Sequence, residues 1–384
     1  MKLRLATFNV ENLVSRNVYG PRRRPQTAPA LALFDFADPA MREQAQASMA
    51  MTLEDDDRQA TALAIAETQA DIMALQEVEN IGVLAPFLKH YVHAVSDIRY
   101  GHLRLLSGND PRGIDCAFAA RKGLVADEDA ILAKSHAQAS FASLGVFDPA
   151  LERFGIGPDD RVFNRDCLEI AIDLGDRDLT LFICHLKSMG YAADGRDQTR
   201  ILRRAEARAI RAIVQARFGD GWREANWAVL GDLNDHRFAI GPGGEIVPTL
   251  PSGIDPLFED FAVDVTAGLP EIERWTLYHR DREGPEGVPV EHHVQLDHIL
   301  ISPALAAANP DPQPQIVRRG LGYATPLDPT HPDRSIAWLS TRADRYPRIG
   351  WLRPQASDHC PVAVSLTIPK TRRCDQAESV PDPG

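Results

Sequence analysis

The strongest constraint on this chain is a set of short apolar runs that each stop at a polar side chain. The run LRLATF stops at Asn9, IMALQ at Glu77, LTLFIC at His185 and AVLG at Asp232. Short runs rich in branched and aromatic side chains are typical of buried strands. Each run therefore predicts a strand whose carboxyl end carries a side chain suited to binding a metal ion or a proton.

Two later motifs have the opposite order. Asp297 and the pair Asp358-His359 come just before apolar runs. If these last two strands run antiparallel to the earlier ones, all the polar positions meet at one edge, where strand ends hold side chains rigidly. Taken singly, each residue also fits a structural role, because Asp and Asn favour turns and Glu77 can cap the following helix. Their joint occurrence favours a functional site.

Strands outnumber strong helices along the chain. Strands are expected at residues 1–9, 72–75, 116–120, 167–173, 179–186, 227–230, 297–301 and 361–368. Helices are expected at 80–90 and 198–218, with a short helix over 40–51 and a separate one that begins at the acidic run 55–57. Some strand connections are short and others carry helices, which favours a β-sandwich covered by helices over a doubly wound parallel sheet.

One catalytic domain over residues 1–368 is expected, because no linker separates two sets of strands. Pro- and Gly-rich stretches predict loop insertions near 18–57, 125–165 and 303–354, and a flexible tail over 369–384. No apolar run approaches the roughly 18 residues that a membrane span needs.

The charge balance bears on the partners of the protein. The chain has 42 Lys and Arg against 54 Asp and Glu, a net charge of −12, which disfavours general binding to duplex DNA. Its 5 cysteines are scattered and show no CxxC spacing, so we expect reduced thiols and a cytoplasmic protein.

Six motifs carry a resemblance to a known family. FNVEN at 8–12, LQEVEN at 75–80, HLKS at 185–188, LGDLND at 230–235, LDHI at 296–299 and SDHCPV at 357–362 resemble the endonuclease/exonuclease/phosphatase superfamily. Pancreatic deoxyribonuclease and the abasic-site endonucleases share that fold. The resemblance implies an α/β four-layer sandwich, with two mixed β-sheets packed face to face and helices outside. It also implies Mg²⁺- or Mn²⁺-dependent cleavage of a phosphoester bond.

The resemblance implies a metal site at three residues. Glu77 would be the main ligand, Asn9 would lie beside it, and Asp358 would belong to the coordination sphere. Coordination chemistry supports these residues independently, because a hard ion such as Mg²⁺ prefers carboxylate and amide oxygens as ligands. A cation also offsets the negative charge of the phosphodiester.

The remaining motif residues would carry the reaction. By the same resemblance, Asp232 would orient or deprotonate the attacking water, and Asn234 would hold that water or a phosphate oxygen. His359 would transfer a proton or stabilise the transition state, with Asp297 as its orienting carboxylate. His185 would contact the phosphate.

Three basic residues are candidates for substrate binding. Arg112 and Arg165 each precede a predicted strand, and Lys187 lies two residues after His185. A surface ion pair with a neighbouring Asp explains Arg112 equally well. The arginines of helix 198–218, the run Arg22–Arg24, and Trp275, Trp338 and Trp351 can be solvated or packed instead of contacting nucleic acid.

The sequence as a whole favours a metal-dependent nuclease that hydrolyses phosphodiester bonds in DNA or RNA by in-line attack of water. A phosphatase or phosphodiesterase acting on small phosphoesters, inositol phosphates or phospholipid head groups is the first alternative, and the negative net charge suits it. A non-catalytic scaffold on the same fold is the second.

Overall fold

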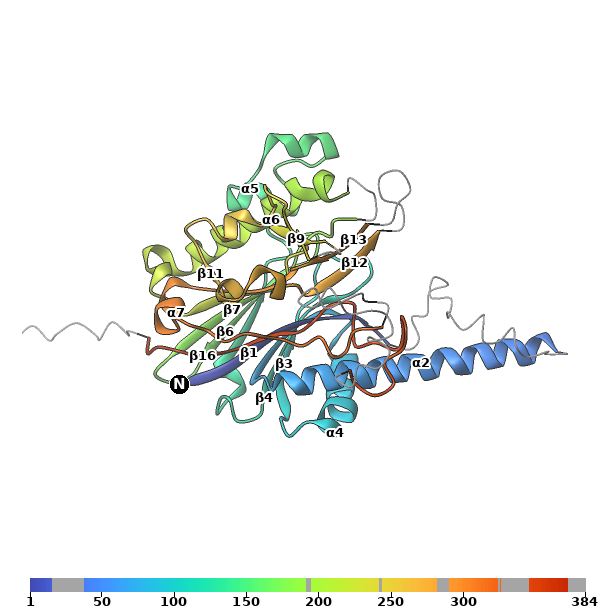
Figure 1. The fold of residues 1–384 in the computed structure, drawn as a ribbon. Helices are drawn as coiled ribbons and strands as arrows, with labels where there is room; N and C mark the ends of the chain where they lie inside the picture. Colours follow the sequence, from blue (N-terminus) through green and yellow to red (C-terminus); the bar gives the residue numbers. More distant parts are fainter. Residues whose placement is uncertain are drawn as a thin grey trace, which may run out of the picture.

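Two mixed sheets form the centre of the molecule (Figure 1). The computed structural model describes residues 1–15, 38–190, 195–241, 244–281, 290–323, 325 and 345–371, with the backbone alone at 46–53, 279–281 and 290–291. Sheet I has the order β15 (Gln315–Ile316), β16 (Val362–Thr367), β1 (Lys2–Leu13), β2 (Ile72–Val78), β4 (Asp115–Arg121), β3 (Tyr100–Leu105). Sheet II has the order β11 (Val263–Asp264), β14 (Asp297–Ile301), β8 (Trp227–Asp232), β7 (Asp178–His185), β6 (Cys167–Asp173), β5 (Ile131–Ser135).

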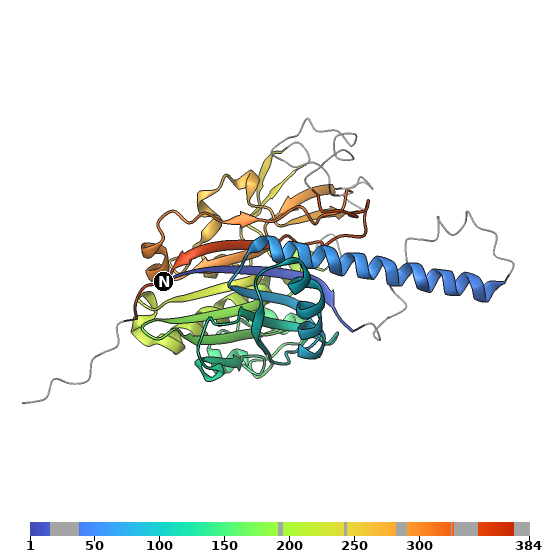
Figure 2. The ribbon, with the colours of Figure 1, turned by 90° about the horizontal axis from the view of Figure 1, so that it is seen from below.

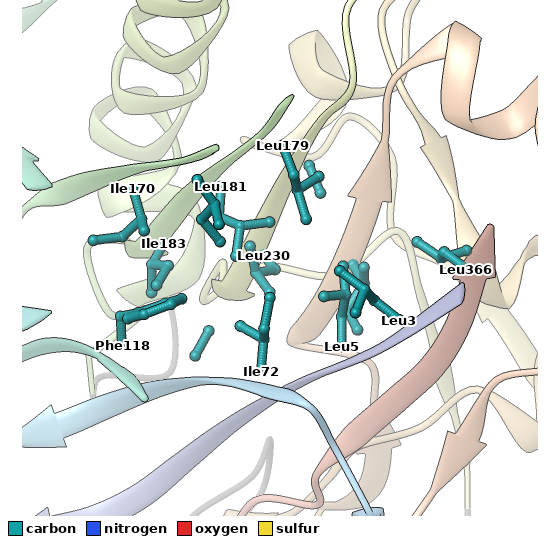
Figure 3. Close-up of a cluster of buried hydrophobic side chains, with 14 of the residues drawn as sticks. Leu3, Leu5, Ile72, Phe118, Ile170, Leu179, Leu181, Ile183, Leu230 and Leu366 are labelled. Carbon is teal, nitrogen blue, oxygen red and sulfur yellow. The ribbon is translucent and has the colours of Figure 1, made fainter. Parts of the chain in front are cut away.

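The two sheets pack face to face through alternate residues of their strands. Leu3 and Leu5 of β1 and Ile72 of β2 meet Leu181 of β7 and Leu230 of β8 in one fully buried cluster (Figure 3). Because side chains alternate along a strand, the residues between these positions face outward, toward the helices.

Helices cover both outer faces and complete the four layers (Figure 1). On sheet I lie α2 (Pro39–Thr68), α3 (Ile81–Phe87), the π-helical turn Leu88–Val92 and α4 (His93–Val95). On sheet II lie α6 (Gly195–Phe218) and α5 (Phe141–Leu144). A short helix, α7 (Pro303–Ala308), follows β14. The predicted four-layer sandwich is therefore correct.

Strand directions decide where the polar motifs lie. In sheet I, β1 is parallel to β2 and antiparallel to β16. In sheet II, β7 is parallel to β8, and β8 is antiparallel to β14. The ends of β1, β2, β7 and β8 and the starts of β14 and β16 consequently share one edge of the sandwich, as the predicted convergence requires.

A third, smaller sheet lies at that edge. Sheet III has the order β10 (Ile246–Pro248), β9 (Phe238–Ile240), β13 (Val290–Val294), β12 (Leu277–Asp281). Its strand β9 follows the β8 motif in the chain, and β13 leads into β14. This sheet was not predicted, because its strands are short and lack a clear alternation.

Several predicted elements were wrong in extent. The helices expected at 40–51 and from residue 55 are one continuous helix, α2, whose N-terminal half extends beyond the sandwich in Figures 1 and 2. Asp57 does not cap it but accepts hydrogen bonds from Arg353 and Gln355, far away in the sequence. The insertion expected at 125–165 contains the edge strand β5, and the one at 303–354 contains α7 and β15.

Other features of the described residues bear on the predictions. Cys116, Cys167, Cys184 and Cys360 are buried free thiols. Trp275 is buried and packs against His293, whereas Trp351 is exposed. Arg22–Arg24, Trp338 and Cys374 lie outside the described residues. Within the described part of the chain, no helix has the length and apolar character needed to span a membrane.

Candidate active site

The site lies at one end of the hydrophobic core between the two sheets. The inward-facing stripe of β1 continues from Leu5 to Asn9, and that of β7 continues from Ile183 to His185. The same alternation takes β8 from Leu230 to Asp232, and Asp297 begins the inward stripe of β14. The packing that buries the core thus places four polar side chains together at its end.

Asp232 is the centre of this group. Its Oδ2 accepts hydrogen bonds from Asn9 Nδ2 at 3.1 Å and from Asn234 Nδ2 at 3.0 Å. Its Oδ1 accepts the backbone N–H of Asn234 at 2.9 Å. His185 Nε2 lies 3.4 Å and His359 Nε2 lies 3.8 Å from Oδ2. Two imidazoles therefore face one carboxylate that amide groups hold in place.

Two backbone features shape the turn around Asp232. Gly231 has a φ of 144°, and a Cβ there would lie 1.9 Å from the carbonyl oxygen of Cys184, so only glycine fits. Asn234 has a φ of 51°, and its Nδ2 also reaches the carbonyl oxygen of Leu186 at 3.1 Å. These features explain why the motif LGDLND has Gly231 directly before Asp232 and Asn234 two residues after it.

His359 and Asp297 form a buried pair. His359 Nδ1 lies 2.8 Å from Asp297 Oδ2, and the two side chains are 7% and 0% exposed. Burial alone would lower the pKa of His359, but Asp297 and Asp232 raise it well above its ordinary value. Burial raises the pKa of Asp232 to about 6, against the opposing charge of His359. The two carboxylates thus favour the protonated imidazole, whose Nε2 lies 3.8 Å from Asp232 Oδ2.

His185 has the opposite electrostatic character. Burial and the nearby guanidinium of Arg165 lower its pKa well below the ordinary value. Its Nε2 lies 4.0 Å from Glu77 Oε1, so it sits between Glu77 and Asp232. A neutral His185 beside a charged His359 gives the site one imidazole in each protonation state.

Glu77 reaches the site through an irregular backbone. Its φ is 67°, and the register of β2 with β4 shifts between Leu75 and Val78. Such a bulge redirects a side chain, and left-handed backbone at a non-glycine residue is typical of functional sites. Oε2 accepts the N–H of Asn12 at 2.9 Å, while the side chain stays 12% exposed.

Asp358 lies on the solvent side of the same group. Its backbone N–H donates to Glu11 Oε2 at 3.1 Å, and its carboxylate remains exposed. Partial enclosure by protein atoms, with the charges of Glu11 and Glu77, raises the pKa of Asp358 to about 7. Excess negative charge therefore accumulates around Glu77 and Asp358.

Two groups of residues could hold a metal ion. Ligand atoms of Asp232, Asp297 and His359 all lie within 4.8 Å of one another. A protonated imidazole does not coordinate a metal, however, and His359 already engages Asp297 through Nδ1. The more exposed Glu77 and Asp358 have carboxylates whose mutual repulsion a cation would relieve, and oxygen ligands suit Mg²⁺.

A sequence profile of the Endonuclease/Exonuclease/phosphatase family matches residues 6–359. The chain belongs to this family. The match spans all of the strand-end motifs, and the structure places them within one site. No curated protein matches the chain.

Solved structures of the family also align with the chain. A family protein from Leptotrichia buccalis is 11% identical, with a TM-score of 0.48, and covers 95% of this chain and 100% of its own. TDP2 from D. rerio, complexed with a single strand DNA product, is 15% identical with a TM-score of 0.46, covering 95% and 99%. Truncated TDP2 from Caenorhabditis elegans is 15% identical with a TM-score of 0.45, covering 95% and 97%.

The predicted substrate-binding residues have different surroundings in this family member. Arg112 is 48% exposed, pairs with Asp110 at 2.9 Å, and lies 3.8 Å from Glu77. Arg165 is buried, and its guanidinium donates to Asp110 and to the carbonyl oxygen of Leu186. Arg112 therefore lies at the exposed side of the site, whereas the buried Arg165 holds the loop after β7 through the carbonyl oxygen of Leu186.

Two buried charges of α6 hold the loops of the site, and sequence reasoning missed them. Arg203 donates through Nε to Asp235 Oδ2 at 2.9 Å and through Nη1 to the carbonyl oxygen of Lys187. Glu206 accepts the backbone N–H groups of Asn164 and Lys187. Asp235, the final residue of LGDLND, was the available signal in the sequence. A second carboxylate so near Asp232 needs a positively charged side chain of its own.

Four other arginines of α6 bind local partners instead of lining an open basic groove. Arg196 donates to Asp235, Arg200 pairs with Asp197, and Arg217 pairs with Glu169. Arg211 donates to the carbonyl oxygen of Glu259. Their charge is largely offset by local partners, which disfavours the reading of this helix as a nucleic-acid surface.

Proposed function

We propose that this protein is a Mg²⁺- or Mn²⁺-dependent phosphodiesterase of the nuclease type, which hydrolyses its substrate by direct attack of water. The observation that carries the proposal is the buried Asp297–His359 pair, whose Nε2 faces Asp232 at 3.8 Å. A candidate general acid and a candidate general base therefore lie side by side, and hydrolysis of a phosphodiester uses both.

Asp232 is the residue suited to hold and deprotonate the attacking water. Asn9 and Asn234 fix its carboxylate, and a pKa of about 6 leaves it ionised at neutral pH yet basic enough to accept a proton. Attack on phosphorus forms the new P–O bond and breaks the bond to the leaving oxygen. No covalent intermediate with the enzyme is needed.

His359 is the residue suited to donate a proton or a hydrogen bond where negative charge develops. Asp297 keeps the ring in one orientation and stabilises its protonated form, as a carboxylate does in a catalytic triad. His185, neutral and buried, can hydrogen-bond a phosphate oxygen from the other side of Asp232.

The residues around Glu77 fit a divalent cation. Glu77 and Asp358 would hold it, with Asn9 nearby, because partial enclosure by protein atoms and the negative charges of Glu11 and Glu77 raise the pKa of Asp358 despite the positive charges of His359 and Arg353. When bound, the ion supplies positive charge against the phosphate. Arg112 could add a second positive contact at the open side.

The net charge of −12 supports small phosphoesters as the alternative substrates. Polymer cleavage remains the leading proposal, because the half-exposed Arg112 lies 3.8 Å from Glu77 and can offset the net negative charge locally. A non-catalytic scaffold is the weakest alternative, since it gives no reason to keep a charged imidazole and several carboxylates together at a cost in stability.

A substrate panel tests the proposal. Single- and double-stranded DNA, RNA, an abasic duplex, inositol phosphates and bis-p-nitrophenyl phosphate would each be incubated with Mg²⁺, Mn²⁺ or EDTA. His359→Ala serves as the control for contaminating nucleases. We expect metal-dependent cleavage of a nucleic acid that the variant loses. Cleavage of inositol phosphates alone would support the alternative, and no cleavage at all would support the scaffold.

We also propose a reducing, cytoplasmic location. Cys167 and Cys184 lie directly opposite each other on β6 and β7, yet both are free thiols. Mass spectrometry of protein alkylated at lysis in its native host tests this, and a Cys167–Cys184 disulfide would contradict it.

A further inference from the structure

Thr276 lies where four segments of the site meet. It precedes β12 of sheet III and is 0% exposed. Its Oγ1 accepts the backbone N–H groups of Leu296 at 3.0 Å and of Asp297 at 3.1 Å. Its carbonyl oxygen accepts the N–H of Cys360 at 2.8 Å, and its own N–H donates to Val294. One residue thus holds the chain on both sides of the Asp297–His359 pair.

This matters because, apart from the pairing of β14 with β8, little else among the described residues fixes Asp297. Its Oδ2 engages His359, but among the described residues its Oδ1 is buried with no hydrogen-bond partner. No second side chain therefore sets the plane of the carboxylate. Its position depends on the backbone of residues 296 and 297, which β8 holds on one side and the Thr276 hydroxyl holds through both N–H groups.

The partner imidazole depends on the same residue. Leu277 forms an isolated antiparallel bridge with His359, next to the hydrogen bond from Cys360 to Thr276. On its other side, the His359 N–H donates to Ser357 Oγ at 3.0 Å. Thr276 and Ser357 thereby enclose the short segment that carries the imidazole.

We propose that Thr276 is a positioning residue for the Asp297–His359 pair, coupling sheet III to proton transfer at the site. Its side chain holds the carboxylate and its main chain holds the imidazole, so it sets the 2.8 Å distance between them. The effect on rate rests on the proposed function, whereas the effect on the hydrogen bond does not. Substrates contact the pair, and Thr276 acts only through it.

Matched substitutions test the proposal. Thr276→Val keeps the shape but removes the hydroxyl, leaving two buried N–H groups without their acceptor, whereas Thr276→Ser keeps the acceptor. Thr68→Val controls for loss of a buried threonine hydroxyl elsewhere, since Thr68 is also 0% exposed and accepts the N–H of Ala70. Circular dichroism would verify that each variant is folded.

The first measurement needs no activity. The low-field proton NMR signal of the His359 Nδ1–H, assigned by its loss in His359→Ala, reports the hydrogen bond to Asp297. We expect it in wild type, Thr276→Ser and Thr68→Val, and expect it shifted or lost in Thr276→Val. An unchanged signal in folded Thr276→Val would overturn the proposal, whether or not a substrate is known.

The second measurement uses bis-p-nitrophenyl phosphate or the substrate found in the panel. We expect Thr276→Val to lower kcat about tenfold or more with little change in KM, and Thr276→Ser to stay within about threefold of wild type. In the His359→Ala background, Thr276→Val should change kcat less than about twofold, because the residue it positions is gone. An equal loss in both backgrounds would show a general structural effect and refute the positioning role. Absence of cleavage by wild type would count against the proposed function alone.

Discussion

The two sheets contribute to the site in different ways. Sheet II supplies His185, Asp232 and Asp297 from regular strand ends, and all three are almost fully buried. Sheet I supplies Glu77 from a bulge with left-handed backbone, and the loop before β16 supplies the exposed Asp358. His359, from the same loop, is buried and joins the sheet II residues through its contact with Asp297. One half is an extension of the core, and the other is an irregular, more open rim.

The supports of the two halves differ in the same way. Behind sheet II, Arg203 and Asp235 form a pair that is 0% exposed on both sides. Beside sheet I, Arg353 bridges Glu11 and Asp57 but remains 33% exposed. The difference indicates a division of labour, in which the rigid half orients proton transfer and the open half admits a cation and the substrate phosphate.

The largest expected effect separates the two halves by kinetics. His359→Ala should lower kcat by about 10²- to 10⁴-fold, because it removes the protonated donor. The Mg²⁺ concentration for half-maximal rate should change little, since the cation is expected at the other half. Asp297→Asn should give a milder loss. Initial rates over a Mg²⁺ titration measure both quantities, and wild-type rates for His359→Ala at saturating Mg²⁺ would refute its role.

A second test compares the two supporting arginines by stability. Arg203→Met leaves Asp235 buried beside Arg196 alone and should lower the free energy of unfolding by about 3–5 kcal/mol. Arg353→Met removes two ion pairs of a partly exposed side chain and should cost less, about 1–2 kcal/mol. Urea unfolding followed by circular dichroism measures both. Equal losses would show that the rim is as firmly held as the core.

Glu77→Gln addresses the open half directly. Replacing the carboxylate removes one ligand charge but keeps the shape, so half-maximal activity should need on the order of tenfold more Mg²⁺. The rate at saturating Mg²⁺ should fall much less than in His359→Ala. Glu79→Gln is the matched control, because Glu79 accepts a hydrogen bond from Ser15 on the neighbouring loop. An equal shift in both variants would remove Glu77 from the metal site.

The smallest effect concerns pH and a buried carboxylate of sheet II outside the site. Burial raises the pKa of Asp166 to about 6, although it accepts the N–H of His136. Because the folded pKa exceeds the unfolded value, this group stabilises the fold at low pH, and that contribution is lost as pH rises through about 6. The free energy of unfolding of Asp166→Asn, measured relative to that of the wild type, should therefore rise by about 1 kcal/mol between pH 5 and pH 7.5.

The check is urea unfolding at several pH values, with Asp159→Asn as an exposed control. A stability difference between Asp166→Asn and wild type that stays constant with pH would contradict the raised pKa.

The sequence determined the sandwich and the buried half of the site. Strand alternation is a local property, so runs such as LTLFIC predict both a buried face and a polar residue where that face ends. The motifs also placed Asp232, Asn234, Asp297 and His359 in one family pattern. Antiparallel entry of the last two strands was the single condition, and β14 and β16 meet it.

Tertiary structure alone decided the supports and the open half. The bulge that turns Glu77 toward His185 depends on pairing with β4, and contacts of Asp57 join α2 to the segment before β16. Thr276 lies 21 residues from the Asp297 amide that it holds, and Arg203 lies 32 residues from Asp235. Such partners leave no periodic trace in the sequence, because each depends on where two distant segments meet after folding.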